Sequence, residues 1–412
     1  MDIIISNNTS KPIYEQITSQ IKQMIMTGEL KPGESIPSMR SLAKSLHISV
    51  ITVQRSYEDL QKDGFIETTV GRGSFVSSKN KEFIQEEKQR EIESHLQKAI
   101  ELSKENGISL AKLIDLLKIF YEEKSNMSDY SLKVENLTKK YDDFLLDKVS
   151  FYVPKGNIVG LIGENGAGKS TTINTMLDII ERDSGDIYIL DSEKNKVNNE
   201  IREKIGVVFD GNNFPEDLTP QKLNNVLTRI YKNWNDKTFF KYIEKFNLPK
   251  TKKIKNFSKG MKMKLSISVA LSHNAELLIL DEATSGLDPI VRDDILDILL
   301  EFVQDENKSI LISSHITSDL EKVADYIVFI HKGKVIFEET KDNLIYDYGI
   351  MKCKQKDFSS IDKEDIIRFR KMDYGYEILV KNKNELERKY PNMVMDNIKI
   401  EDIMLMYVKG EK

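Results

Sequence analysis

The sequence contains a single cysteine, Cys353, in 412 residues, so no disulfide bond can form within the chain. A protein without internal disulfides suits a reducing cytoplasm, and Cys353 is expected to be a small core residue. Long apolar runs are also absent, because no stretch approaches the ~20 residues that cross a bilayer. No basic segment precedes the first short apolar run, so the pattern of a signal peptide is missing. These absences together predict a soluble, cytoplasmic chain.

A large excess of charge of one sign is missing as well. There are 61 lysines and arginines against 66 aspartates and glutamates, which gives a formal net charge of −5. Such a balance does not by itself indicate a nucleic-acid partner, so any such assignment depends on local motifs. Hydrophobic residues make up 40% of the chain, which is enough for sizeable cores and excludes wholesale disorder. The length predicts two or more domains.

One segment fits a phosphate-binding loop at every fixed position. Gly163-Glu-Asn-Gly-Ala-Gly-Lys-Ser170 matches the pattern G-x-x-x-x-G-K-[ST], with a predicted strand over 159–162 before it and a predicted helix over 171–180 after it. Its glycines let backbone N–H groups surround phosphate oxygens, and the helix N-terminus adds partial positive charge. We predict that Lys169 reaches the β- and γ-phosphates of ATP and that the Ser170 hydroxyl helps to hold Mg²⁺.

Residues 11–76 predict a compact unit made of a helix, a short helix, a turn, a longer helix and a two-stranded hairpin. Ser38 opens the short helix and Ser49 caps the longer one, which buries a face formed by Val53, Tyr57 and Leu60. This is the layout of a winged helix-turn-helix, whose third helix enters the major groove of DNA. A small helical domain for protein contacts remains the alternative, because nine lysines and arginines accompany eight aspartates and glutamates up to residue 80.

Several separated motifs in this unit closely resemble GntR-family transcription regulators. They are Pro12-Ile-Tyr-Glu-Gln-Ile17, Gly28-Glu-Leu-Lys-Pro-Gly-Glu-Ser-Ile-Pro-Ser38, Arg40-Ser-Leu-Ala43, Thr52-Val-Gln-Arg-Ser-Tyr57 and Gly71-Arg-Gly-Ser-Phe-Val76. The resemblance implies a repressor-type module that binds a near-palindromic double-stranded DNA operator as a dimer. On the third helix, Thr52, Gln54 and Arg55 are expected to be exposed and to point away from the buried face. The candidate DNA contacts are Ser38, Arg40, Ser49, Thr52, Gln54, Arg55, Arg72 and Gly73.

Two further helical segments follow the winged unit. The first, over 81–104, is charged, and the second, over 108–121, is apolar on more than one face. A helix this apolar requires cover, either on its own winged domain or at a dimer interface. The interface is favoured, because GntR regulators of the YtrA-like subfamily have such a short helical tail and lack a large ligand-binding domain. We therefore expect a DNA-binding domain at 1–79 and a dimerisation segment with a linker at 80–125.

From Leu132 to about Thr340, the order of motifs resembles an ABC-transporter ATP-binding subunit. Leu277-Leu-Ile-Leu-Asp281-Glu282 predicts a buried strand that ends in two carboxylates, at the edge of the sheet where ligands bind. Such a pair alone would indicate the solvated start of a helix, but Ser285-Gly-Leu-Asp288 and then His315 follow at the family's spacing. The resemblance implies that Asp281 contacts Mg²⁺ through water, that Glu282 polarises the attacking water, and that His315 holds the γ-phosphate.

The resemblance adds residues from three other segments. Tyr141 stands where the family places an aromatic ring on adenine, and Phe257-Ser-Lys-Gly-Met261 stands at the signature, commonly Leu-Ser-Gly-Gly-Gln. Lys259 departs from the usual signature, and Asp210 replaces a glutamine that usually contacts Mg²⁺ or water. The predicted catalytic residues are Lys169, Glu282 and His315, and the predicted Mg²⁺ ligands are Ser170, Asp210 and Asp281. The predicted nucleotide-binding residues are Tyr141, Gly163, Glu164, Asn165, Gly166, Ala167, Gly168, Lys169, Ser170, Thr171, Asp210, Ser258, Gly260, Asp281 and Asp288.

The expected fold is multidomain. An N-terminal α+β winged helix-turn-helix and a short helical dimerisation segment precede an α/β P-loop ABC ATPase domain at 130–342. A small α+β C-terminal extension follows at 343–412, with a strand over 376–380 and a final helix over 400–408, and it resembles the variable extension of ABC-type exporter ATPases.

The leading hypothesis is a homodimeric, Mg²⁺-dependent ATPase subunit that energises a separate export permease and is fused to a DNA-binding regulator. Such a chain would be cytoplasmic, or peripheral at the inner face of the cell membrane through its permease. One alternative is a pure transcription regulator whose ABC domain senses nucleotide or a partner. Another is a transport ATPase whose winged domain only clamps the dimer, which Arg40, Arg55 and Arg72 argue against.

Overall fold

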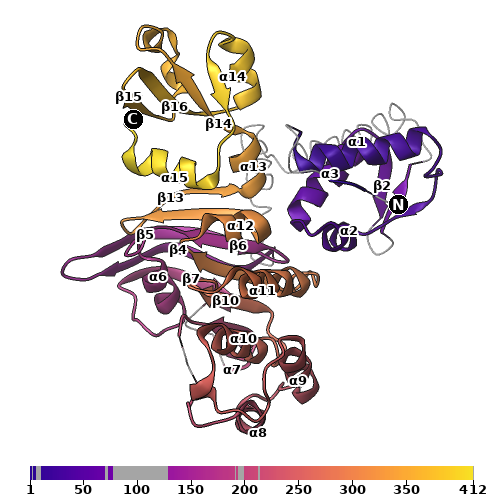
Figure 1. The fold of residues 1–412 in the computed structure, drawn as a ribbon, viewed down its shortest axis with the longest axis vertical. Coiled ribbons are helices and arrows are strands. Elements are labelled where there is room, and N and C mark those ends of the chain that lie inside the picture. The colour runs from indigo at the N-terminus through magenta and orange to yellow at the C-terminus, as the bar shows by residue number, and fades with distance from the viewer. Residues whose placement is uncertain are drawn as a thin grey trace, which may run out of the picture. The chain divides into compact units, whose positions relative to one another are not determined.

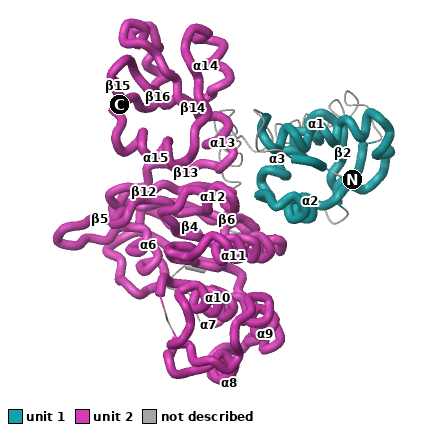
Figure 2. The backbone as a smooth tube through the Cα atoms, in the orientation of Figure 1, with its two compact units in different colours: residues 1–129 teal, residues 130–412 magenta. Residues whose placement is uncertain are grey.

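The computed structural model describes residues 1, 3–5, 11–69, 73–77, 129–190, 192–193, 199–211 and 214–411. The chain divides into two compact units, residues 1–129 and residues 130–412, each with its own hydrophobic core (Figure 2). The helices predicted over 81–104 and 108–121, the apolar dimerisation helix among them, lie outside the described residues. In the part that is described, no helix combines the length and the apolar character that crossing a membrane requires.

In its described residues, the N-terminal unit has three helices and a small antiparallel sheet with the strand order β1-β3-β2. Figure 1 labels the three helices and β2. Helices α2 and α3 start where the sequence predicts, because the Ser38 and Ser49 hydroxyls accept hydrogen bonds from the backbone N–H groups of Ser41 and Ile51 at 3.2 and 3.1 Å. The short first strand was not predicted, and it extends the hairpin to three strands. The elements are α1 (Ile13–Met26), β1 (Ser35–Ile36), α2 (Met39–Leu46), α3 (Val50–Lys62), β2 (Ile66–Thr69) and β3 (Gly73–Val76).

The larger unit is built on a six-stranded sheet with the order β13-β12-β6-β11-β10-β9. All neighbouring strands are parallel except β12 and β13. The carboxyl ends of the five parallel strands therefore meet at one edge, which is where ligands bind in sheets of this kind. The strands are β6 (Ile158–Ile162), β9 (Ile205–Val208), β10 (Leu277–Asp281), β11 (Ser309–Ser314), β12 (Tyr326–His331) and β13 (Lys334–Thr340).

A second, antiparallel sheet with the order β5-β4-β7-β8 shares a hydrophobic core with the first. Helix α6 (Lys169–Met176) contributes Ile173 and Met176 to this core. The helix is shorter than predicted, because Asp178 takes a left-handed backbone conformation with φ 62° just after the helix ends. The strands are β4 (Tyr130–Lys140), β5 (Leu145–Pro154), β7 (Ser184–Ile189) and β8 (Ser192–Glu193).

Helices pack on the other face of the large sheet, and α8 and α9 belong to a segment that protrudes from it. In Figure 1, α8 and α9 lie at the end of this unit that is opposite to the C-terminal sheet. Helix α10 packs against both α9 and β9, so it joins the helical segment to the sheet. The helices are α7 (Asn199–Arg202), α8 (Pro220–Ile230), α9 (Asp236–Lys245), α10 (Lys259–Ala270), α11 (Pro289–Phe302) and α12 (Thr317–Val323).

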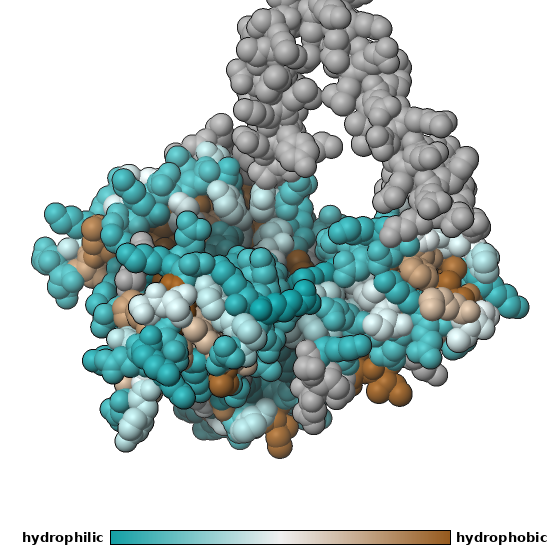
Figure 3. Space-filling view, turned by 90° about the horizontal axis from the view of Figure 1, so that it is seen from above, coloured by the Kyte–Doolittle hydropathy of each residue, from teal (hydrophilic) through white to brown (hydrophobic). Residues whose placement is uncertain are grey.

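The C-terminal residues form a four-stranded antiparallel sheet with the order β15-β16-β14-β17, and they include the predicted strand and the predicted final helix. Cys353 at the end of β14 is half-buried beside this sheet's core, and burial raises the pKa of its thiol. On the face that Figure 3 shows, hydrophilic residues cover most of the described surface. The elements are α13 (Lys341–Tyr346), β14 (Tyr348–Cys353), β15 (Arg368–Met372), β16 (Gly375–Lys381), α14 (Lys383–Lys389), β17 (Val394–Asp396) and α15 (Ile400–Lys409).

Candidate functional site

The phosphate-loop motif connects the carboxyl end of β6 to the first residue of α6, as the sequence predicts. Gly166 and Gly168 have φ angles of 79° and 114°, a region that glycine enters without the steric cost of a Cβ. At Gly163 a Cβ atom would lie 2.4 Å from the carbonyl oxygen of Ile330, so the close approach of β12 excludes a side chain. The loop therefore wraps tightly and leaves the N-terminus of α6 open toward ligand.

Lys169 is buried at the start of α6, and its ammonium group has three oxygen partners. It donates to the carbonyl oxygens of Gly163 and Glu164 at 2.8 and 3.2 Å, and it lies 3.1 Å from Glu282 Oε1. The other carboxylate oxygen of Glu282 lies 2.6 Å from His315 Nδ1. The three residues predicted to be catalytic, Lys169, Glu282 and His315, thus form one chain of contacts that joins the start of α6 to the carboxyl ends of β10 and β11.

Glu282 follows β10 in a left-handed conformation with φ 53°, and its backbone N–H donates to Ser313 Oγ at 3.0 Å. The same Ser313 hydroxyl donates to Asp281 Oδ1 at 2.5 Å, so one serine on β11 orients both acidic residues. Sequence reasoning missed this role. The available signal was the pair Ser313-Ser314 directly before His315, which a parallel neighbour strand brings beside Asp281.

A cavity of about 550 Å³ opens beside the loop. Its lining includes seven of the predicted nucleotide-binding residues, the predicted catalytic residue Glu282, and two residues, Asp143 and Phe144, that the sequence analysis did not include. Tyr141 is 38% exposed, and the Lys139 ammonium lies over its ring at 5.8 Å from the centroid. The lining residues are Tyr141, Asp143, Phe144, Asn165, Gly166, Gly168, Lys169, Ser170, Thr171 and Glu282.

Other predicted nucleotide contacts lie elsewhere. The Ser258 hydroxyl accepts from the Met261 N–H at 3.2 Å and caps α10, and the Asp288 carboxylate accepts from the Val291 N–H at 3.0 Å and caps α11. Asp210, just after β9, lies 3.0 Å from Lys259 Nζ. Neither these residues nor Gly260 line the cavity beside the phosphate loop.

The residues predicted to contact DNA lie on α2, α3 and β3, and two of those expected to be exposed on α3 differ from expectation. Thr52 is only 3% exposed. Arg55 is half-buried, and its guanidinium carbon lies 3.9 Å from the Tyr14 ring centroid. Gln54 is exposed, as expected, and donates to Glu58 at 2.9 Å. Ser49 is buried, and its hydroxyl caps α3 as predicted.

Arg72, at the predicted tip of the hairpin, lies outside the described residues. The remaining predicted contacts, Ser38, Arg40 and Gly73, lie at the start of α2 and at the first residue of β3.

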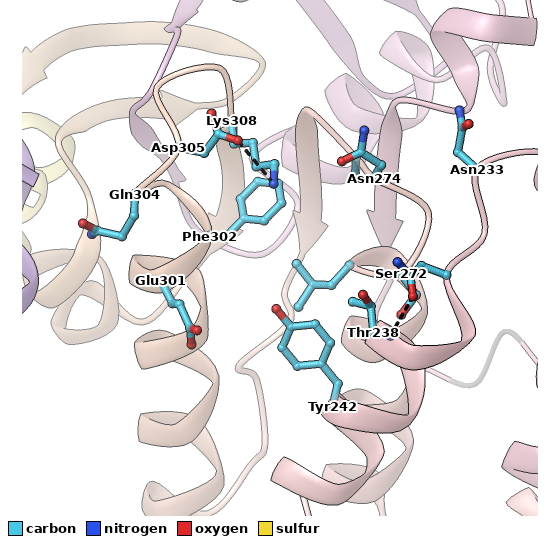
Figure 4. A pocket seen from close by; sticks show the side chains of 13 residues that line it. Asn233, Thr238, Tyr242, Ser272, Asn274, Glu301, Phe302, Gln304, Asp305 and Lys308 are labelled. Atoms are coloured by element: carbon cyan, nitrogen blue, oxygen red, sulfur yellow. Dashed lines mark hydrogen bonds and ion pairs between the residues drawn. The ribbon is translucent and has the colours of Figure 1, made fainter. Parts of the chain in front are cut away.

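A further cavity, of about 540 Å³, lies between α9, the turn after α10 and the C-terminal end of α11 (Figure 4). Its walls carry Thr238, Tyr242, Ser272, Glu301 and Asp305, and burial raises the pKa of the Tyr242 hydroxyl. None of the predicted nucleotide or DNA contacts lines it.

Comparison with known proteins finds a family match in each of the two units of the chain. Residues 146–285 match the family described as ABC transporter, and residues 13–76 match bacterial regulatory proteins of the gntR family. The bacitracin transport ATP-binding protein BcrA of Enterococcus faecalis is 33% identical over 213 residues, which cover 51% of this chain and 69% of BcrA. This chain belongs to the ABC transporter ATP-binding family, with a GntR domain at its N-terminus.

Other ABC relatives match a similar share of this chain. The lantibiotic transport ATP-binding protein SrtF of Streptococcus pyogenes is 36% identical over 214 residues, which cover 51% of this chain and 91% of SrtF. The ABC transporter ATP-binding protein YtrB of Bacillus subtilis is 31% identical over 218 residues, which cover 53% of this chain and 74% of YtrB. A solved ATP-binding subunit of an ABC transporter is 29% identical with a TM-score of 0.48, over 52% of this chain and 91% of that one.

Proposed function

We propose that this chain hydrolyses ATP and that its GntR domain binds a DNA operator. The observation that carries the first part is the contact chain Lys169–Glu282–His315 at the mouth of the phosphate loop. A lysine near the loop can neutralise phosphate charge, and a carboxylate held by two cationic or polar neighbours can orient and deprotonate water. A histidine on the far side of that carboxylate can hold both the water and the γ-phosphate.

Mg²⁺ fits the oxygen groups at this edge of the sheet. Mg²⁺ prefers a few carboxylate or hydroxyl oxygens and takes its other ligands from water and phosphate. Ser170 is the second residue of α6, and the Asp281 carboxylate at the end of β10 accepts a hydrogen bond from the Ser313 hydroxyl. These two residues would hold the ion, which would neutralise charge on the β- and γ-phosphates. One carboxylate oxygen of Asp210 is paired with Lys259, so its proposed contact with Mg²⁺ would use the other oxygen.

The proposed active form is a dimer. Ser258 and Gly260 carry the signature's hydroxyl and backbone N–H, and neither lines the cavity in which Lys169 and Glu282 lie. In the family arrangement, the signature of one chain meets the nucleotide on the phosphate loop of another. A single chain would therefore hold an incomplete site, and two chains would complete two sites.

In the leading version of this function, the ATPase drives a separate export permease. It rests on the kinship with transport ATP-binding proteins whose names specify bacitracin and lantibiotics, and it would place the chain at the inner face of the membrane. A second version is a pure regulator whose ABC domain senses nucleotide or a partner. The Asp210–Lys259 pair favours it, because both residues depart from the usual pattern close to the catalytic edge.

The experiment that tests the ATPase is phosphate release by the purified full chain with Mg²⁺ and ATP, beside Lys169→Ala. We expect the substitution to abolish tight nucleotide binding and turnover, because it removes the phosphate-facing charge. Lys155→Ala, in the turn before β6, is a control with the same charge change. Equal turnover by the wild type and Lys169→Ala would contradict the proposal, whereas very slow wild-type turnover would favour the pure regulator.

A further inference from the structure

Asp210 and Lys259 occupy two sites where this chain departs from its family, and they meet. The Lys259 ammonium lies 3.0 Å from Asp210 Oδ1, although 48 other residues separate them in the sequence. Asp210 lies two residues after the end of β9, and Lys259 is the first residue of α10. The pair therefore joins the carboxyl edge of the large sheet to the first turn of the signature helix.

The first turn of α10 also lies close to two other segments. A Cβ atom on Gly260 would lie 3.3 Å from Val291 Cγ1, so α10 begins in close contact with the first turn of α11. A Cβ atom on Gly286 would lie 3.3 Å from Lys259 Nζ, so the lysine passes over the turn that follows Glu282. Lys259 thus lies where three segments of the catalytic edge converge.

The position of Lys259 at the N-terminus of α10 favours pairing with an anion. The N-terminus of a helix carries partial positive charge, so a lysine there is unfavourable unless an anion lies close. Helix α10 has no acidic residue in its own first turn, and the carboxylate of Asp210 supplies the missing negative charge. The next lysines of α10 are paired in the same way with other elements, Lys262 with Glu216 at 3.2 Å and Lys264 with Asp294 at 2.8 Å.

The pair is suited to positioning rather than to stability. Its side chains are 47% and 49% exposed, and exposed ion pairs contribute little to folding because water and salt screen them. Because Lys259 lies between Ser258 and Gly260, a change in the backbone position of the lysine also moves both signature residues.

Resting on the proposed ATPase function, we propose that Asp210 and Lys259 are a matched positioning pair that sets the orientation of Ser258 and Gly260. The two unusual residues compensate each other. With only one of them present, the signature turn is misoriented. With neither, the residues common in the family orient the turn instead.

A double-mutant cycle on the full-length chain tests this pairing. Asp210→Gln and Lys259→Gly are made singly and together, so that the double variant has the residues common in the family. We expect each single variant to lower kcat by about three- to tenfold with little change in KM, and the double variant to return within about twofold of the wild type. Raised salt should lower the wild-type kcat and leave that of the double variant unchanged.

The control cycle uses the pair of α10 farther from the catalytic edge, with Lys264→Gln and Asp294→Asn, which remove the charges without placing glycine inside the helix. It should leave kcat within about twofold, because that pair does not flank the signature residues. If the losses from Asp210→Gln and Lys259→Gly simply multiply in the double variant, the positioning pair is wrong even though the ATPase stands.

Hydrogen–deuterium exchange of the nucleotide-free chain provides a readout that needs no turnover. Asp210→Asn should speed exchange in the peptide that spans Ser258 to Met263, and Asp294→Asn should not, because only the first loses the link at the helix start. Unchanged exchange in Asp210→Asn would overturn the proposal. A wild type without any ATP hydrolysis would instead overturn the proposed function, and the exchange result would still decide on the pair.

Discussion

At the scale of single residues, Glu282 is the point on which the proposed chemistry depends. It shares its two carboxylate oxygens between Lys169 at 3.1 Å and His315 at 2.6 Å, and Ser313 fixes its backbone. A neutral amide at this place would keep the size and most of the contacts but could not take a proton from water. Substitution of this residue is therefore expected to block hydrolysis and to leave nucleotide binding intact.

We predict that Glu282→Gln lowers kcat by about 10²- to 10⁴-fold and leaves ATP affinity within a few fold, as expected for loss of a general base. The variant should accumulate as an ATP-bound dimer, which light scattering after gel filtration would detect. Glu276→Gln is the matched control, because Glu276 precedes the same strand at its far end and pairs with Lys204 at 2.9 Å. Undiminished turnover in Glu282→Gln would show that another residue activates the water.

At the scale of elements, α3 and the start of α2 form the candidate DNA-reading surface. The N-terminal residues of a recognition helix are the ones that reach base edges. The burial of Thr52 and Ser49 leaves Gln54 as an exposed residue in this part of α3, with Arg40 at the start of α2. Base readout should therefore depend more on Gln54 than the sequence alone suggested.

We predict that Arg40→Ala and Gln54→Ala each weaken binding to the operator by about 5- to 100-fold, in line with the usual worth of a phosphate or base contact. The probe is a duplex selected by the wild-type chain from a random pool, and affinity is measured by fluorescence anisotropy at fixed salt. Lys62→Ala, at the C-terminal end of the same helix, is the control and should have little effect. Loss of ATP hydrolysis in these variants would contradict a separate DNA-binding role.

A second prediction at this scale concerns His273, which lies in the turn after α10. His273 is 1% exposed, its ring stacks on Tyr231 with centroids 4.4 Å apart, and its Nδ1 donates to the Glu203 carbonyl at 2.8 Å. Burial lowers the pKa of His273 below its usual 6.5. Below pH 6.5, His273 therefore binds a proton more readily in the unfolded chain than in the folded chain, so acid destabilises the folded state.

The melting temperature of the ATPase unit should accordingly fall by a few degrees from about pH 7.5 to about pH 5.5, by the linkage of protonation to folding. His273→Gln should fall less over the same interval, because glutamine has no proton to gain. Differential scanning calorimetry at the two pH values measures both. An equal or steeper fall in His273→Gln would rule out His273 as a source of the acid sensitivity.

Local sequence patterns predicted those elements whose causes are local. The caps Ser38 and Ser49, the phosphate loop and the strand that ends at Asp281 all have their signals within a few residues. The burial of Thr52, the link from Ser313 to Asp281 and the approach of Lys259 to Asp210 depend instead on which strands and helices become neighbours. Distances between segments far apart in the chain are set by packing, and no short motif encodes them.

At the scale of the whole molecule, two modules that each imply a dimer are joined in one chain. Closure of an ATPase dimer around nucleotide could change the spacing of two recognition helices relative to their half-sites on DNA. Such coupling requires that DNA binds the ATP-bound and nucleotide-free forms with different affinity, and by linkage DNA would then change the affinity for ATP by the same factor.

We predict that the operator affinity of the Glu282→Gln chain changes by about fivefold or more when Mg²⁺ and ATP are added, the lower end of usual coupling energies. Salt must be held fixed, because phosphate contacts make the affinity steeply salt-dependent. The control is the Lys169→Ala, Glu282→Gln double variant, which should not bind ATP and should show no change. No change in Glu282→Gln with ATP demonstrably bound would mean that the chain holds two independent activities, and a change would mean that nucleotide state directly controls DNA binding.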